Sequence, residues 1–237
     1  DTATFIAHNW RRVVALLVLI LIVVGVFSFI NSSQKKKIGD ASGVYSDLSK
    51  DFDKLFGAQA TKDEKEIETA LATLKSKAEQ LSGTAGDTIY GKAGNIYVAA
   101  AMLEKGNIDG AKTALAKYDT KSFAEISAPK ALKQVTDVEP MQEIAALMMA
   151  RVLAEEARIN KLALPEVAKV LLRGVVYGGR LMSVEALVTL NRLATEGESV
   201  AFAKDVTKSF FKARPELQES AGQMLKQAGI QVDGEGA

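Results

Sequence analysis

Apolar residues form one unbroken run near the start of the chain and recur at helical spacing after it. The run spans eighteen uncharged residues, from Val13 to Ile30. As a helix rising ~1.5 Å per residue it would be roughly 27 Å long, close to the hydrocarbon thickness of a bilayer. The pattern therefore predicts a transmembrane helix over residues 13–30, after an N-terminal flank over residues 1–12.

A cleaved signal peptide is the alternative, with Arg11 and Arg12 as its basic region. Signal peptides have an apolar stretch of about 7 to 15 residues and a small-residue cleavage site, whereas this run ends in bulky residues and a polar stop. An uncleaved anchor therefore fits better. Its predicted membrane-interface residues are Trp10, Arg11, Arg12, Lys35, Lys36 and Lys37. The basic residues of the two flanks are nearly balanced in number, so they do not decide the orientation.

Two amphipathic helices are predicted after the polar stop. Val44, Leu48 and Phe52 share one face in a juxtamembrane linker and helix over residues 31–60. The next helix is predicted from an N-cap at Thr61 to a stop at Gly83. Its apolar stripe consists of Ile67, Leu71, Leu74, Ala78 and Leu81.

The most informative stretch covers residues 87–118. Positions 89–103 are apolar or small on nearly every face, which predicts a helix buried on both sides. A turn follows at Gly106 and Asn107, and a second helix follows the turn. This hairpin resembles the tetratricopeptide repeat, in which small residues occupy the crossing of two antiparallel helices. Met102, however, stands where an aromatic residue is usual, and no proline follows Tyr118. The residues matching the repeat are Ala99, Gly106, Ala111 and Leu115.

Further helices are predicted downstream. Pro129 and Pro140 bound a connector, and Pro140 suits the first turn of a long helix whose partner follows a short connection. Three more helices complete the chain before a flexible tail over residues 231–237. The predicted fold class is all-α: a single N-terminal transmembrane helix, then a tetratricopeptide-like helical-hairpin (α-solenoid) domain over residues 61–230.

Composition narrows the function. From residue 38 onward there are 25 basic and 28 acidic residues, interleaved and without the basic stripe of a nucleic-acid-binding domain. The absence of cysteine excludes disulfides and thiolate metal sites. The lone histidine, His8, precedes the apolar run, so neither a histidine pair for zinc nor a Ser-His-Asp triad can form in the chain. We therefore expect no nucleic-acid partner, no metal, no cofactor and no enzymatic activity.

One stripe is a candidate site for a partner. Tyr90, Gly94, Tyr97 and Ala101 recur at i, i+4, i+7 and i+11, which places aromatic and small residues along one face of the helix. Such a stripe could line a concave groove that binds another protein. The alternative, which we favour, is packing against the preceding hairpin, because tyrosine readily serves in a core with a wet edge.

The first half of the chain also resembles the ancillary subunits of the SecYEG translocon (the YfgM family). The likeness lies in the anchor, the helical pair and Tyr90, Gly91, Ala93 and Gly106, and it reaches from about residue 10 to 120. The resemblance implies an inner-membrane protein with a cytoplasmic N-terminus and a periplasmic body that links the translocon to chaperones. The alternative is a structural subunit of another envelope machine, such as a flagellar motor, a secretion apparatus or a cell-division assembly.

Overall fold

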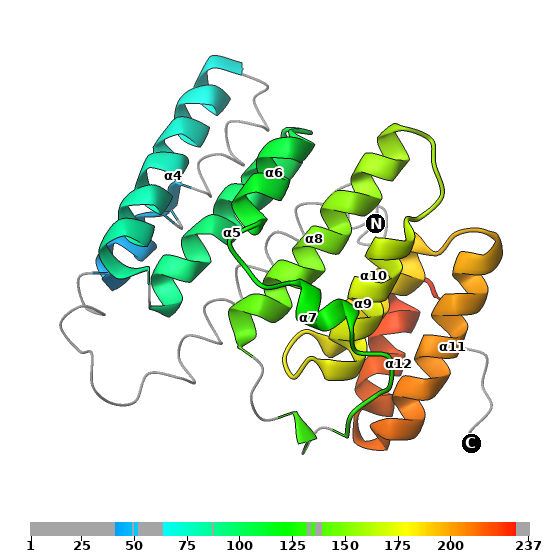
Figure 1. Cartoon of the computed structure of the whole chain (residues 1–237). Coiled ribbons are helices and arrows are strands. Elements are labelled where there is room, and N and C mark those ends of the chain that lie inside the picture. Colours follow the sequence, from blue (N-terminus) through cyan, green and yellow to red (C-terminus); the bar gives the residue numbers. More distant parts are fainter. Residues whose placement is uncertain are drawn as a thin grey trace. The chain divides into compact units, whose positions relative to one another are not determined.

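The structure of the chain, a computed structural model, describes residues 41–48, 50–51, 64–86, 88–131, 134–135 and 139–230. The predicted transmembrane helix, its six interface residues and the predicted tail lie outside these ranges. Within them, no helix combines the length and the apolar character needed to cross a membrane. All regular structure in the described part of the chain is helical (Figure 1). The all-α prediction is therefore confirmed for these residues.

The chain divides into two compact units, which we call unit 1 (residues 1–117) and unit 2 (residues 118–237). The single domain predicted for residues 61–230 is thus shared between both. The division follows α6 (Ile108–Leu115), because the short helix α7 (Lys121–Ala124) packs against α8 (Pro140–Ile159) and α9 (Glu166–Gly178) of unit 2.

Unit 1 is built from α4 (Glu64–Ala85), α5 (Ile89–Glu104), α6 and the helical residues 41–48 and 50–51. Helix α5 packs against both α4 and α6 (Figure 1). It is buried on nearly every face, as predicted. Helix α4 continues through Gly83 to Ala85, so the predicted stop is wrong. Gly83 does not adopt the positive φ of a helix-ending glycine, and the helix continues through it.

Unit 2 contains α8 (Pro140–Ile159), α9 (Glu166–Gly178), α10 (Ser183–Leu193), α11 (Gly197–Ala213), a 3-10 turn η2 (Pro215–Leu217) and α12 (Gln218–Gln227). Pro140 occupies the first turn of α8, as predicted. Helix α9 is central, since it packs against α7, α8, α10 and α11. Gly174 permits this packing: a Cβ there would overlap the carbonyl oxygen of Phe123 near the end of α7.

Candidate functional site

The four residues that match the tetratricopeptide pattern lie in one helical hairpin. Ala99 of α5 and Ala111 and Leu115 of α6 are all fully buried. Gly106, in the turn between the helices, has a φ of 72°, in the left-handed region that favours glycine. The sequence pattern therefore places small residues inside the hairpin and glycine at its turn.

The turn itself is held by a Schellman motif, the arrangement in which the two residues after a helix donate back to its last carbonyls. The N–H of Gly106 donates to Leu103 over 2.9 Å, and the N–H of Asn107 donates to Met102 over 2.9 Å. Asn107 then caps α6, because its Oδ1 accepts from the N–H of Gly110 over 2.8 Å. One tight turn thus ends α5 and starts α6.

The predicted tyrosine stripe lies beneath another helix. Tyr90 is 6% exposed and Tyr97 is 2% exposed, and the ring of Tyr45 lies 5.1 Å from the first and 5.7 Å from the second, centroid to centroid. The hydroxyls of Tyr45 and Tyr97 share a 3.0 Å hydrogen bond. Burial, followed by the neighbouring Tyr97, raises the pKa of Tyr45 well above its ordinary value. The helical residues 41–48 and 50–51 therefore occupy the surface where the sequence placed a candidate groove.

The small residues of the stripe are covered as well. A Cβ on Gly94 would lie 3.4 Å from the Cα and Cβ of Ala78, so α4 packs directly against α5 here. Ala101 is fully buried. The four residues Tyr90, Gly94, Tyr97 and Ala101 thus belong to the packed interior of unit 1 and do not line an open groove among the described residues.

The helix that covers the stripe differs in phase from the prediction. Tyr45 and Leu48 are buried, whereas Val44, which the sequence placed on the inner face, is only half-buried. The physical reason is the two tyrosine rings of α5, against which a third ring can pack edge to face. Phe52, the next residue of the predicted face, lies outside the described residues.

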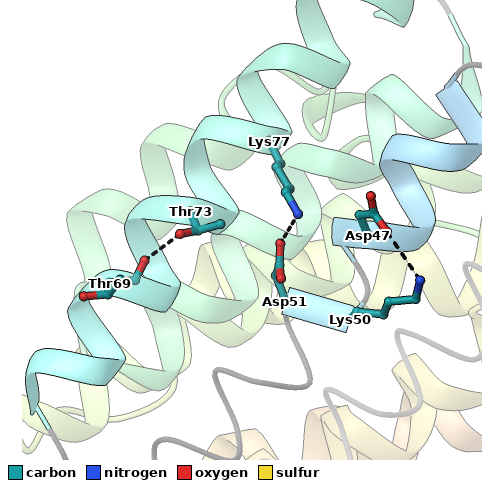
Figure 2. A network of polar contacts seen from close by, with 6 residues as sticks. All are labelled: Asp47, Lys50, Asp51, Thr69, Thr73 and Lys77. Atoms are coloured by element: carbon teal, nitrogen blue, oxygen red, sulfur yellow. Dashed lines mark hydrogen bonds and ion pairs between the residues drawn. The ribbon is translucent and has the colours of Figure 1, made fainter.

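Polar contacts join the same helix to α4 (Figure 2). The carboxylate of Asp51, which is 6% exposed, forms an ion pair with Lys77 of α4. Asp47 and Lys50 form a second pair at 3.4 Å within the helix, where both side chains are exposed. The aromatic contacts and the partly buried ion pair together make residues 41–51 an integral element of unit 1.

Unit 2 contains a buried carboxylate that the sequence analysis did not find. Glu143 of α8 is fully buried, and its two oxygens accept the backbone N–H groups of Arg180, Leu181 and Met182, each over 2.9 Å. Burial raises the pKa of Glu143, while the three N–H groups and Arg214 act against that shift. The carboxylate therefore serves as the hydrogen-bond acceptor for the turn between α9 and α10.

Arg214 holds the same turn from another side. It is fully buried, and its guanidinium donates to the carbonyl oxygens of Lys130, Gly179 and Tyr177 over 2.9, 2.8 and 2.9 Å. Glu143 and Arg214 thus bind opposite kinds of backbone group in residues 177–182. These side chains therefore fix the backbone of the turn.

A third buried charge joins α8 to α10. Arg151 donates from Nη2 to the carboxylate of Glu185 over 2.6 Å and to the hydroxyl of Thr189 over 2.8 Å. Glu143 and Arg151 both lie on the buried, mostly apolar face of α8. A charged residue at such a position in the sequence could have indicated a buried polar contact. In the described ranges, no group of three His, Cys, Asp or Glu side chains is arranged as a metal site.

A helical hairpin with small residues inside and glycine at its turn, as formed by α5 and α6, is the building unit of helical-repeat proteins, a class that presents surfaces to other proteins. The chain belongs to the tetratricopeptide repeat-like domain family, whose model matches residues 4–171. The match continues past the end of unit 1 and ends within α9. Comparison with curated proteins and with solved structures gave no match.

Proposed function

We propose that the chain is a membrane-anchored adaptor whose helical body binds other proteins of the bacterial envelope. The observation that carries the proposal is the reach of the family match. It begins at residue 4 and so includes the apolar run at residues 13–30 together with the helical body. A segment shared with a family of binding domains fits an anchor better than a leader that is removed.

The packing of residues 41–51 supports the same proposal. The short sequence between the apolar run and Ala41 leads directly into a helix that is fastened to α4 and α5. An anchor at residues 13–30 would therefore hold the body close to the bilayer. By resemblance, the anchor spans the inner membrane and the body lies in the periplasm. The partners are then the Sec translocon and periplasmic chaperones. The proposal makes the chain a binding protein and not an enzyme.

Orientation can be tested with one added cysteine, because the chain has none of its own. Lys105 is exposed after α5, so Lys105→Cys should react with a membrane-impermeant thiol reagent in intact cells. Lysed cells supply the control for total reactivity. Labelling only after lysis would place the body in the cytoplasm and overturn the orientation.

Partners can be identified by placing a photoreactive amino acid at the same exposed position in the full chain. We expect adducts with translocon subunits or periplasmic chaperones. A matched variant should keep the body but carry an unrelated apolar anchor in place of residues 13–30, and it should give the same adducts if the body selects the partner. Adducts only with another envelope machine would refute the translocon assignment. No protein adduct from exposed positions around both units would refute the adaptor.

A further inference from the structure

The described large apolar side chains that are most exposed gather at one end of unit 2. Ile159, Leu162 and Val167 are 51%, 68% and 57% exposed. Ile159 ends α8, Leu162 lies in the connection, and Val167 lies in the first turn of α9. We call these three residues, with Lys161 between them, the α8–α9 tip. In Figure 1 this end of the hairpin extends past the neighbouring helices of the same unit.

The turn at the tip places a lysine in a backbone conformation that favours glycine. Helices α5, α8 and α12 all end in the same Schellman motif, in which the third residue after the helix donates to a carbonyl five residues back. The left-handed residue is Gly106 after α5 and Gly229 after α12, but it is Lys161 after α8, with a φ of 56°. A side chain in that conformation costs stability that glycine would not. The tip thus has a lysine in a backbone conformation that glycine adopts at lower cost.

Charge distinguishes Lys161 from the other cations near the tip. Arg158 donates twice to Glu155, over 2.6 and 2.7 Å, and Lys169 pairs with Glu166 at 2.6 Å. For Lys161, the described residues offer no ion pair, and its side chain is exposed. The tip therefore presents one cation without an ion pair in the described residues, beside three exposed apolar side chains.

We propose that the α8–α9 tip docks into the interfacial region of an anionic lipid bilayer. A projecting turn with three exposed apolar side chains and a cation has the features of a segment that enters the boundary between headgroups and acyl chains, where apolar residues are buried and a basic residue meets anionic lipid. The lysine stem lies along the apolar residues while its ammonium reaches acidic headgroups. The proposal rests on the proposed function only in that the anchor brings a bilayer within reach.

The test uses the full chain in vesicles of phosphatidylcholine, with or without phosphatidylglycerol. Leu162→Cys carries a polarity-sensitive fluorophore, and Met224→Cys in α12, where the native side chain is 36% exposed, carries the same label as a control. With phosphatidylglycerol, emission at position 162 should shift to the blue and be quenched by a spin-labelled lipid. The label at position 224 should show neither change.

Variants at Lys161 separate docking from folding. Lys161→Gln and Lys161→Gly should each reduce the ratio of docked to undocked tip by about fivefold, the contribution of one cation at an anionic surface. Lys161→Gly should at the same time increase thermal stability, because glycine suits the left-handed conformation. Lys208→Gln, at an exposed position of α11, should leave docking unchanged. Unchanged docking in both Lys161 variants would show that Lys161 makes no contact with acidic headgroups, and it would overturn the proposal.

Two further outcomes would also overturn it. Equal quenching at positions 162 and 224 would show that the tip makes no specific contact with lipid. A blue shift at position 162 without quenching by the lipid would show contact with a protein surface instead.

Alkaline extraction tests the anchor separately. If the chain is released while the tip is still quenched by anionic vesicles at neutral pH, the anchor fails and tip docking stands. If the chain is retained and the tip is not quenched, only docking fails.

Discussion

Removing the ring of Tyr45 should release residues 41–51 from unit 1. The ring is 7% exposed and contacts the rings of Tyr90 and Tyr97. Tyr45→Ala removes a buried aromatic side chain, which costs about 3 to 5 kcal/mol. Tyr45→Phe keeps the ring and loses the 3.0 Å hydroxyl contact with Tyr97, so it should cost only about 1 kcal/mol.

Hydrogen exchange of the full chain measures this release where it occurs. Tyr45→Ala should accelerate exchange in residues 41–51 and in α5, and leave unit 2 unchanged. Val44→Ala is the matched control, since Val44 is a half-buried neighbour in the same helix, and it should have a much smaller effect. Unchanged protection of α5 in Tyr45→Ala would refute the packing of this helix on the tyrosine stripe.

The same tyrosine links the stability of unit 1 to alkaline pH. Burial raises the pKa of Tyr45 above its ordinary value of 10.0, so the unfolded chain loses this proton first as the pH rises. The stability that Tyr45 contributes is therefore complete below about pH 10 and falls as the pH rises further. Exchange of α5 should accelerate above that pH, and Tyr45→Phe should reduce the pH dependence. An equal dependence in both proteins would contradict this reasoning.

Other substitutions test the two units through urea unfolding of the full chain. Ala99→Leu should destabilise unit 1 by about 1 to 3 kcal/mol through overpacking, and an unchanged midpoint would contradict close packing in the hairpin. Gly106→Ala should cost about 1 to 2 kcal/mol because φ is positive there, whereas Lys161→Gly should stabilise by about 1 kcal/mol; effects of equal sign would refute the comparison of the two turns. Glu143→Ala should cost about 3 to 5 kcal/mol by leaving buried N–H groups without an acceptor, with faster exchange in residues 180–182 as its local signature.

The hairpin of unit 1 could be predicted because its signals are local. Apolar and small residues cover nearly every face of α5, and Gly106 stands at the turn after it, where a positive φ is required. The predicted stop at Gly83 is wrong because glycine can end a helix with a positive φ or continue it with helical φ and ψ, and sequence alone does not decide which. Helix α4 simply continues through it to Ala85.

The phase of residues 41–51 could not be read from the helix alone. A count of aliphatic residues selects Val44, whereas the structure buries Tyr45. The decisive contacts are with Tyr90 and Tyr97, about half of the unit away in sequence, and a tyrosine is ambiguous between surface and core until such partners are known. The same contacts bury the tyrosine stripe of α5, as in the packing alternative that the sequence favoured over an open groove.

Buried charges in unit 2 show a different limit of sequence reasoning. A glutamate among apolar residues indicates burial, but the partners of Glu143 are backbone N–H groups, which every non-proline residue carries and which no sequence pattern marks. The partners of Arg214 are equally hard to predict, because its three acceptors are backbone carbonyl oxygens. One side chain comes from α8 and the other follows α11, and both bind the turn between α9 and α10. The turn is therefore fixed by elements that precede and follow it, so its geometry depends on unit 2 having assembled.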